Sequence, residues 1–448
     1  MNNPNIKDLP TFIDFVVIGF GASGIAASIE LTKYRIPFIV LEKLSTFGGC
    51  WNSAIETSCL QTHRDCYKFY GVDYDKEIGS FPKKNEILSY FKKTIQKFNI
   101  QDRVFYNTTV SIKKCKENEH GNWIIYVNST TQIFCKHILL CVGVNYKPNI
   151  PKYEQLQFEN NKNENPMRVI HSKDFSKFIK INENYLNEKK KIIIVGNGAS
   201  CCDILNNITT LKNYKNSEIL VFYRSRKYFL PKHIFGIPCH YFLTMPLLYF
   251  FEKISFTLNL VLLTLANMIF INNYLGIPLK KIDSYNIVAS LIIQNLIKTQ
   301  ILSYHNETIE KIDYSNKIVK TNAAIYTKVD LVVFATGYRE VNLKEDLGID
   351  IDSAKVFYNY IIPVVKKDKR KKSLKIIPNI GLIGINRTYN FLLNSQVRTK
   401  WYIENVFLKN NLVEKDIISW INNTEKRKAE NNLEFLDSTY ELFEINYR

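Results

Sequence analysis

Residues 15–24 read FVVIGFGASG, an apolar run that leads directly into three glycines spaced as G-x-G-x-x-G. The run predicts a buried strand, and residues 25–31 have the composition of a helix. Glycines with this spacing permit a tight turn and let backbone N–H groups at a helix N-terminus approach a pyrophosphate. A strand before the motif and a helix after it are the context that a dinucleotide site requires. The stretch therefore predicts a βαβ unit that binds a dinucleotide.

A second motif of the same kind, GNGAS at residues 196–200, follows the apolar run 192–195. Two dinucleotide sites in one chain favour a redox enzyme that passes electrons between two bound cofactors. The predicted fold class is α/β, with two Rossmann-like dinucleotide-binding domains and the second domain inserted in the first.

The residues that end the next strand of each unit differ in charge. Glu42 ends the apolar run 38–41, 18 residues after Gly24. A carboxylate at this place accepts hydrogen bonds from ribose hydroxyls and repels a 2′-phosphate, which is typical of the adenosine end of FAD. The corresponding run of the second unit leads into a basic turn made of Arg224, Ser225 and Arg226. Guanidinium groups and a hydroxyl favour the 2′-phosphate of NADPH. A solvated basic turn is the alternative interpretation.

Composition sets further limits. With 448 residues, 46% of them hydrophobic, the chain is long enough for two or three globular domains. The net charge of +18 leaves a peripheral membrane association open, but no basic stripe interleaved with aromatic residues indicates nucleic acid. Nine scattered cysteines and no secretory signal at the N-terminus favour a cytoplasmic protein with reduced thiols. No histidine or cysteine spacing predicts a metal site.

The predicted domains divide the chain into three parts. Residues 1–175 form the first part of the FAD-binding domain, 176–325 the NADPH-binding domain, and 326–448 the second part of the FAD-binding domain with C-terminal helices. A polar linker is expected at 159–165. The stretch 254–279 contains no charged residue, so we expect an apolar helical insert at about 240–279 that covers the active site or dips into a membrane interface. A helix that spans a membrane is the alternative.

Periodicity predicts the other elements. Helices are expected at 85–98 and 395–407, and strands at 110–115, 123–127, 132–135, 137–141, 331–335 and 380–385.

Several motifs in order carry a resemblance to a known family. Besides the two glycine motifs, they are FGGCW at 47–51, LQTHR at 60–64, FPKKNE at 81–86, the pair His171 and Phe175, and ATGY at 335–338. With these motifs the chain resembles the flavin-containing monooxygenases over nearly its whole length. The apolar region after Pro231 is similar to that of the plant YUCCA-type branch.

The resemblance implies roles for individual residues. The residues implied to bind FAD are Gly19, Gly21, Ser23, Gly24, Glu42, Lys43, Gly49, Trp51, Val110 and Gly143. Those implied to bind NADPH are Gly196, Gly198, Ser200, Arg224, Ser225 and Arg226, and Thr336 and Gly337 are implied to approach cofactor backbone. Thr62, His63 and His171 are the implied catalytic residues. Core packing is the alternative for Trp51, and a structural role is the alternative for His171.

The chain departs from the family pattern at four places. Asn165 and Met167 replace a phenylalanine and a glycine before His171, Cys201 takes the third small position of the second glycine motif, and Val142 replaces a hydroxyl residue. His63 stands where many members have asparagine, and its charge depends on pH.

The implied function is that of an NADPH-dependent monooxygenase. NADPH reduces FAD, the reduced flavin forms a C4a-(hydro)peroxide with O₂, and a small organic substrate is oxygenated. The reaction is N- or S-oxygenation, Baeyer–Villiger insertion or oxidative decarboxylation of a 2-oxo acid. Two alternatives stay open: an NADPH oxidase or reductase without productive oxygenation, and a non-catalytic binding protein. A flavin disulfide reductase is disfavoured because Cys50 has no second cysteine at short spacing.

Overall fold

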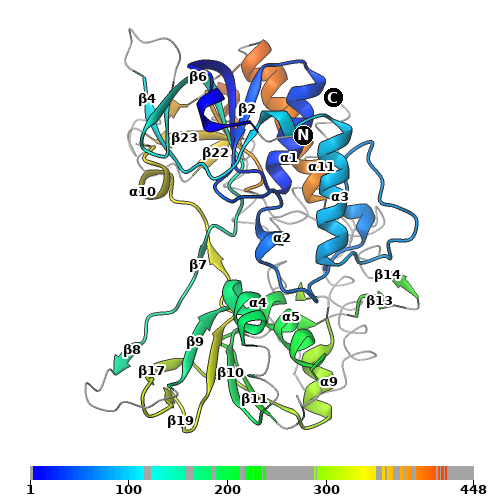
Figure 1. Cartoon of the computed structure of the whole chain (residues 1–448), viewed down its shortest axis with the longest axis vertical. Helices are drawn as coiled ribbons and strands as arrows, with labels where there is room; N and C mark the ends of the chain where they lie inside the picture. The colour runs from blue at the N-terminus through cyan, green and yellow to red at the C-terminus, as the bar shows by residue number, and fades with distance from the viewer. Residues whose placement is uncertain are drawn as a thin grey trace.

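The apolar run before the first glycine motif forms strand β1 (Phe12–Ile18), as predicted, in the computed structural model of the chain (Figure 1). It lies between β2 (Phe38–Leu41) and β6 (Thr131–Leu140), and both are parallel to it. Helix α1 (Ala22–Lys33) makes the crossover from β1 to β2. Continuous apolar runs suit strands that are covered on both faces, so β1 and β2 form the core of this sheet.

The structure describes part of the chain only. The described residues are 4–115, 123–156, 166–182, 185, 188–211, 215, 217–225, 227–229, 231–234, 236–238, 287–288, 290–349, 356–358, 361–366, 374–377, 379–385, 390–409, 412–413, 415–417 and 419–420. The predicted linker at 159–165 and the predicted apolar insert at 254–279 lie outside them. Within these ranges, no helix has both the length and the apolar character needed to cross a membrane.

The first sheet has the order β3-β2-β1-β6-β5-β4, and β25 also pairs with β6. Two separate strands were predicted at 132–135 and 137–141, but β6 is one continuous strand. Its first half alternates in burial because it pairs antiparallel with β5, whereas its second half is buried between β1 and β25. The remaining strands of this sheet are β3 (Val104–Phe105), β4 (Val110–Lys114), β5 (Trp123–Val127) and β25 (Ile380–Leu382).

The first lobe also contains helices α2, α3 and α11. Helix α3 (Lys84–Lys97) confirms the predicted helix at 85–98, and the short α2 (Cys50–Ser53) precedes it. Helix α11 (Phe391–Tyr402) packs along α1 and continues as a π-helical segment, Ile403–Leu408. It therefore begins one turn before the predicted start at 395.

The second lobe contains a five-stranded parallel sheet with the order β16-β11-β10-β20-β9. Its strands are β9 (Arg168–His171), β10 (Lys191–Val195), β11 (Glu218–Phe222), β16 (Leu302–His305) and β20 (Leu331–Phe334). Its helices are α4 (Ser172–Ile181), α5 (Ala199–Ile208) and α9 (Ile292–Lys298). A second, four-stranded sheet contains β8 (Glu154–Leu156), β17 (Ile309–Asp313), β18 (Ile318–Thr321) and β19 (Ile325–Tyr326).

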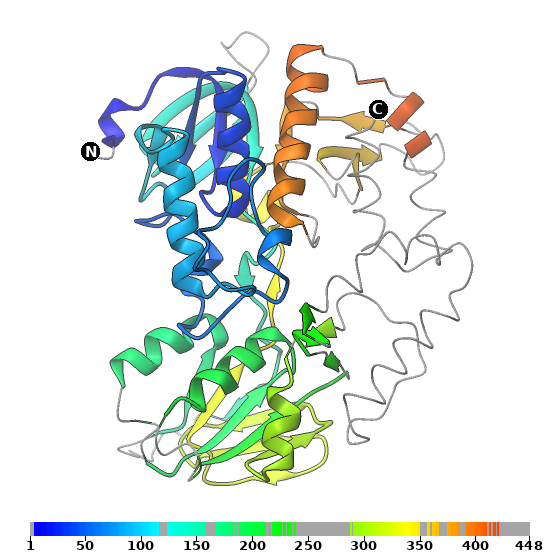
Figure 2. The same cartoon turned by 90° about the vertical axis from the view of Figure 1, so that its right-hand side faces the viewer.

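The chain crosses between the lobes twice, and the two crossings lie side by side (Figures 1 and 2). They form the antiparallel pair β7 (Lys147–Pro148) and β21 (Tyr338–Arg339). Asp346, on α10 (Leu343–Leu347), accepts hydrogen bonds from Arg339 at 2.9 and 3.1 Å and also contacts Lys147. Since β9 and β20 belong to the second sheet, the crossings lie outside the predicted domain boundaries at 175 and 326. The architecture is a two-lobed α/β fold.

The remaining elements are short. They are the helical turns Ile6–Asp8, Arg64–Cys66 and Gln101–Arg103, and the strands β12 (Tyr228–Phe229), β13 (His233–Ile234), β14 (Ile237–Pro238), β15 (Ile287–Val288), β22 (Val356–Tyr358), β23 (Ile362–Lys366) and β24 (Leu374–Ile376).

Candidate functional site

The first glycine loop joins β1 to α1 with backbone contacts that admit no side chain. A Cβ atom at Gly24 would lie 2.0 Å from the carbonyl oxygen of Gly19. Gly19 itself has φ +94°, and a Cβ there would lie 2.8 Å from the carbonyl oxygen of Cys141. Gly21 is the N-cap of α1 and supplies no side-chain acceptor. The N–H groups of the first helical turn therefore lack a capping side chain and can bind an anion.

Two further glycines lie against this loop. Gly49, with φ +56°, approaches so closely that its Cβ would lie 3.0 Å from the Cα atom of Gly21. Gly384, with φ +77°, would place a Cβ 2.6 Å from the Cβ of Ser23, whose hydroxyl donates to the carbonyl oxygen of Cys141 at 3.4 Å. The C-terminal segment thus closes onto the first loop, and sequence reasoning did not single out Gly384.

The carboxylate of Glu42 is held at the edge of the same loop. It is 6% exposed and accepts hydrogen bonds from the backbone N–H groups of Phe20 at 2.6 Å and Leu44 at 2.8 Å. Burial raises the pKa of Glu42, and these N–H groups partly counter the rise by stabilising the charged form. A carboxylate has about four lone-pair sites, so acceptor capacity is left for ribose hydroxyls.

Three other predicted FAD residues lie near this carboxylate or loop. The backbone N–H of Thr108 donates to the carbonyl oxygen of Glu42 at 2.9 Å, which places Val110, at the start of β4, beside it. Lys43 is exposed on the other side of Glu42. Gly143 has φ +73° and follows β6 beside the first loop, and a Cβ there would meet no atom within 4 Å.

Trp51 lies half-buried on α2 and is fixed by a tyrosine. Its indole Nε1–H donates to the hydroxyl of Tyr67 at 2.9 Å, and the Tyr67 ring stacks against Phe391 of α11 with centroids 6.5 Å apart. Tyr67 is a residue that sequence reasoning missed, because no motif or periodicity links it to Trp51. The aromatic contacts agree with a packing role for Trp51, and its position along a flavin stays a prediction.

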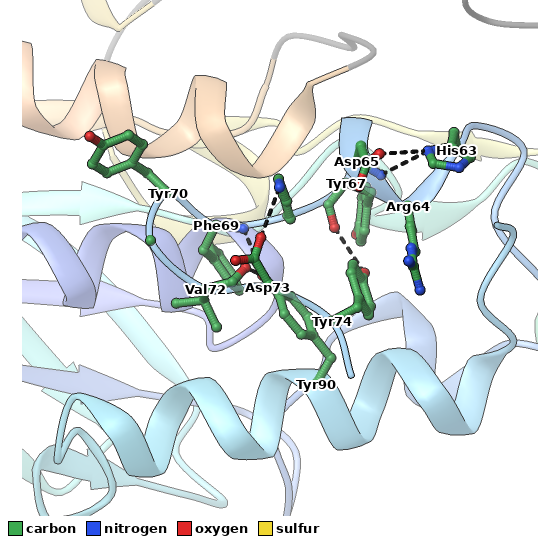
Figure 3. Close-up of polar contacts among 12 residues, drawn as sticks. His63, Arg64, Asp65, Tyr67, Phe69, Tyr70, Val72, Asp73, Tyr74 and Tyr90 are labelled. Carbon is green, nitrogen blue, oxygen red and sulfur yellow. Dashed lines mark hydrogen bonds and ion pairs between the residues drawn. The ribbon is translucent and has the colours of Figure 1, made fainter. Parts of the chain in front are cut away.

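His63 caps the helical turn Arg64–Cys66 (Figure 3). Thr62, the residue before it, is half-buried. The Nδ1 atom of His63 accepts a hydrogen bond from the backbone N–H of Asp65 at 3.2 Å and lies 3.3 Å from the Asp65 carboxylate. Burial lowers the pKa of His63, and the Asp65 carboxylate partly counters this shift. The catalytic roles of Thr62 and His63 stay predictions.

The segment that follows His63 is packed on α3 through three tyrosines (Figure 3). The hydroxyl of Tyr74 donates to the carbonyl oxygen of Tyr67 at 2.8 Å, and the ring of Tyr74 stacks on Tyr90 of α3 with centroids 4.0 Å apart. The turn that carries His63 is therefore continuous with a well-packed part of the first lobe.

The second glycine loop joins β10 to α5 in the second lobe. Gly196 has φ +106°, and a Cβ there would lie 2.4 Å from the carbonyl oxygen of Ala335. A Cβ at Gly198, the N-cap of α5, would meet no atom within 4 Å. Ser200 lies half-buried in the first turn of α5, and Cys201 beside it is fully buried and packs in the core. The loop is thus tight at its first glycine and open at its second.

Asn197 connects this loop to the basic turn after β11. Its side-chain amide donates to the carbonyl oxygen of Ser225 at 3.0 Å and to the hydroxyl of Tyr304 at 2.7 Å. The ring of Tyr304 stacks on Tyr223 with centroids 4.2 Å apart. Asn197 was missed as a site residue because an x position of a glycine motif carries no signal of its own.

Arg224 and Ser225 are exposed at the carboxyl end of β11, next to the second glycine loop. Arg224 forms no ion pair with another residue in the described ranges, and its side chain is exposed. Arg226 lies outside the described residues.

His171 has both ring nitrogens engaged. Its Nδ1 accepts from the backbone N–H of Lys173 at 3.1 Å and caps α4, while Nε2 donates to the carbonyl oxygen of Gly337 at 3.0 Å. Burial lowers the pKa of His171, which agrees with this neutral form. Thr336 donates to the carbonyl oxygen of Asn149. His171, Thr336 and Gly337 therefore meet where the second lobe joins the crossing strands; these contacts are structural, and a catalytic role for His171 stays a prediction.

Neither a metal-ligand cluster nor a disulfide is present in the part of the chain that the structure describes. Among the described residues no group of three His, Cys, Asp or Glu side chains could hold a metal ion, and the eight cysteines there are free thiols.

Comparisons with known proteins show which proteins this chain resembles. The family model described as L-lysine 6-monooxygenase/L-ornithine 5-monooxygenase matches residues 67–233. The uncharacterized oxidoreductase CzcO of Bacillus subtilis is 27% identical over 195 residues, which cover 43% of this chain and 50% of that protein. The probable indole-3-pyruvate monooxygenase YUCCA1 of Arabidopsis thaliana is 23% identical over 223 residues, or 50% of each chain. The chain thus spans about half the length of these curated relatives.

A solved structure extends the likeness over most of the fold. The crystal structure of OTEMO in complex with FAD and NADP is similar with a TM-score of 0.69 at 14% identity, over 93% of this chain and 89% of that chain. At this identity the likeness concerns the fold. Together, the comparisons confirm the predicted resemblance to flavin-dependent monooxygenases.

Proposed function

We propose that this chain, whose sequence and fold resemble flavin-dependent monooxygenases, binds FAD at the first glycine loop and NADPH at the second and oxygenates a small organic substrate with O₂. The NADPH-binding unit is inserted in the FAD-binding unit, with the paired crossings β7 and β21 as its limits. When bound, NADPH supplies a hydride and FAD activates O₂.

One observation carries the proposal. Each loop follows a parallel strand and precedes a helix, and the next strand ends in Glu42 in one lobe but in Arg224 and Ser225 in the other. A buried carboxylate suits two ribose hydroxyls, whereas an exposed guanidinium beside a hydroxyl suits a 2′-phosphate. The open space over Gly198 supports the fit, because a side chain there would occupy the path of a pyrophosphate.

The chain's own residues bind and orient the cofactors in this proposal. Gly19, Gly21 and Gly24 bring backbone N–H groups to the FAD pyrophosphate, and Glu42 accepts from its ribose. Gly196 and Gly198 do the same for NADPH, with Arg224 and Ser225 on the 2′-phosphate. His63 and Thr62 act at the reaction centre, as the resemblance implies.

The experiment that tests the function follows NADPH consumption by the purified protein. We expect a yellow protein whose NADPH turnover rises with one class of added amine, sulfide, ketone or 2-oxo acid, and an oxygenated or decarboxylated product formed with it. Because one relative is named an indole-3-pyruvate monooxygenase, 2-oxo acids are the first class to try. A colourless protein that does not take up flavin would contradict the proposal.

The NADPH assignment has a separate test. Arg224→Ala should raise KM for NADPH about 10- to 100-fold, the equivalent of one charge-assisted hydrogen bond, and leave KM for NADH nearly unchanged. Arg168→Ala is the matched control, since Arg168 is exposed at the amino end of β9, at the opposite edge of the same sheet. Equal effects of Arg224→Ala on both nucleotides would refute the phosphate contact.

An NADPH oxidase is the second candidate, and one observation favours it. His63 stands where an asparagine is usual in the family that the chain resembles, and its Nδ1 is occupied by the backbone N–H of Asp65. Hydrogen peroxide measured against product during NADPH turnover separates the two candidates.

A further inference from the structure

A segment of the first lobe, residues 54–60, enters the second lobe between the two candidate cofactor sites. It follows α2, which Figure 1 shows at the edge of the first lobe that faces α4 and α5. Ile55 is 4% exposed and packs in the apolar core of the second lobe, with Phe175 and Cys202. The first lobe therefore contributes a core residue to the second.

A buried polar contact fixes the same segment to α5. The hydroxyl of Ser58, which is 3% exposed, donates to Asp203 Oδ2 at 2.8 Å. Thr57 donates to the Asp203 carbonyl oxygen at 3.5 Å. Asp203 stands five residues after Gly198, so it belongs to the helix that begins at the second glycine loop. Burial raises the pKa of Asp203 to about 6, and at pH 7 the carboxylate has Ser58 as its hydrogen-bond donor.

Charged side chains reinforce the segment on both sides. Glu56 accepts from Lys84 of α3 at 3.1 Å and from Lys180 of α4 at 2.8 Å, so one carboxylate links the two lobes. Lys232 of the second lobe contacts the Sγ atom of Cys59 at 2.6 Å and lies over the ring of Phe81, 4.9 Å from its centroid.

The other end of the segment leads to His63. The backbone N–H of Leu60 donates to the carbonyl oxygen of Pro82 at 3.0 Å, and that of Lys84 donates to the carbonyl oxygen of Ser58 at 2.9 Å. Only Gln61 and Thr62 separate Leu60 from His63. The Ser58–Asp203 hydrogen bond thus connects helix α5, which begins at the second glycine loop, to the chain that leads to the turn at His63.

We propose that Ser58 and Asp203, with Ile55 as the apolar anchor, are positioning residues that hold the second glycine loop at a fixed place relative to the first lobe. This proposal rests on the proposed function, in which a hydride passes from a nucleotide on the second lobe to one on the first. Hydride transfer needs the reacting atoms within contact distance, and a misplacement of about 1 Å can cost about 100-fold in rate. Both residues lie outside residues 19–24 and 196–198 in the sequence, so we expect cofactor affinities to depend little on them.

The test measures flavin reduction by saturating NADPH under anaerobic conditions, together with the Kd of NADPH and the FAD content. Ser58→Ala should slow reduction about 10-fold or more and leave Kd and FAD content unchanged. Asp203→Asn keeps an acceptor for Ser58 and should reduce at nearly the wild-type rate. Ser53→Ala is the matched control, because its hydroxyl donates within the first lobe, to the carbonyl oxygen of Cys50.

A second variant keeps the proposal testable if Ser58→Ala does not fold. Ser58→Ala leaves a buried carboxylate without its donor, whereas the double variant Ser58→Ala/Asp203→Asn has no charge to bury and should show the same slow reduction. Reduction at the wild-type rate in the double variant, or a slowing explained by weaker NADPH binding, would overturn the proposal.

Hydrogen exchange distinguishes failure of this proposal from failure of the proposed function. Ser58→Ala should speed exchange at the amides of Leu60 and Lys84 and within α5, with or without cofactors. If the wild-type protein shows no flavin reduction, the proposed function fails, and the exchange data alone decide whether the contact orders the segment. If reduction is normal in Ser58→Ala and exchange is unchanged, the positioning role is wrong.

Discussion

The two glycines of the second loop should respond differently to one added methyl group, and this difference separates a packing role from a ligand-facing role. A Cβ at Gly198 meets no atom within 4 Å, and its φ of −83° suits alanine. A Cβ at Gly196 would lie 2.4 Å from a carbonyl oxygen, and φ there is +106°. We therefore compare Gly198→Ala with Gly196→Ala.

The expected magnitudes follow from these contacts. Gly198→Ala should change the free energy of unfolding by less than about 1 kcal/mol, because the lower entropy of the unfolded chain counters the weaker N-cap preference of alanine. Gly196→Ala should cost about 2–5 kcal/mol, since a left-handed backbone and an overpacked contact both add strain. The methyl group at Gly198 should displace a pyrophosphate from one or two backbone N–H groups and weaken NADPH binding about 10- to 100-fold.

Urea unfolding and NADPH titration measure the two quantities, and the flavin absorbance reports whether the first site stays intact. We expect Gly198→Ala to be stable, yellow and weak in NADPH binding, and Gly196→Ala to be unstable. Unchanged NADPH affinity in a folded Gly198→Ala protein would refute the idea that this open space receives the nucleotide.

Three further predictions concern other sites. Glu42→Gln should lower FAD affinity about 10- to 100-fold, because the side-chain amide cannot accept hydrogen bonds from both backbone N–H groups and also from the ribose. Retention of FAD on a desalting column measures the affinity, and full retention would contradict the role of Glu42 in FAD binding. His137 is 8% exposed, and burial lowers its pKa to about 4. Because the unfolded chain binds this proton at a higher pH than the folded chain, the free energy of unfolding should fall by about 3 kcal/mol as pH drops from about 6.5 to 4. His137→Gln should remove this part of the pH dependence in urea unfolding, and an unchanged pH profile would contradict the assignment. Asp346→Asn should speed hydrogen exchange at the amides of Tyr146 and Asn149, which donate to the carbonyl oxygens of Arg339 and Gly337 on β21 and next to it; equal exchange would show that the Asp346 contacts do not order the crossing.

The parts of the fold that sequence predicted are those fixed by local backbone chemistry. Gly19, Gly24 and Gly196 stand where a Cβ would meet a carbonyl oxygen, so their spacing alone identified the turns. The strands before them are continuous apolar runs, which the structure confirms as parallel, buried strands. The prediction of two strands in place of β6 was wrong. The burial pattern of β6 changes along the strand, because its first half pairs with the antiparallel β5 and its second half with parallel strands, and this change resembled a break between two strands.

The contacts that sequence could not predict join residues far apart in the chain. Tyr67 fixes Trp51, Asn197 reaches the carbonyl oxygen of Ser225, and Asp203 accepts from Ser58 across 145 residues. No periodicity or motif spacing records such pairs, because they depend on tertiary packing within a lobe or, for Ser58 and Asp203, between the lobes. The role of His171 could not be predicted either, because one of its two hydrogen bonds joins it to Gly337, 166 residues away.

The side-by-side crossings β7 and β21 have a consequence for engineering the molecule. Because the incoming and outgoing chains are hydrogen-bonded neighbours, the entry and exit points of the inserted unit are adjacent. A short turn that joins residues 148 and 338 would remove the whole second lobe. The removal would also expose Ile55, a first-lobe residue that is buried in the core of the second lobe. A first lobe isolated by a cut at β7 and β21 therefore needs a polar residue in place of Ile55. An exchange of the second lobe between homologous proteins has to include residues 54–60 of the first lobe as well.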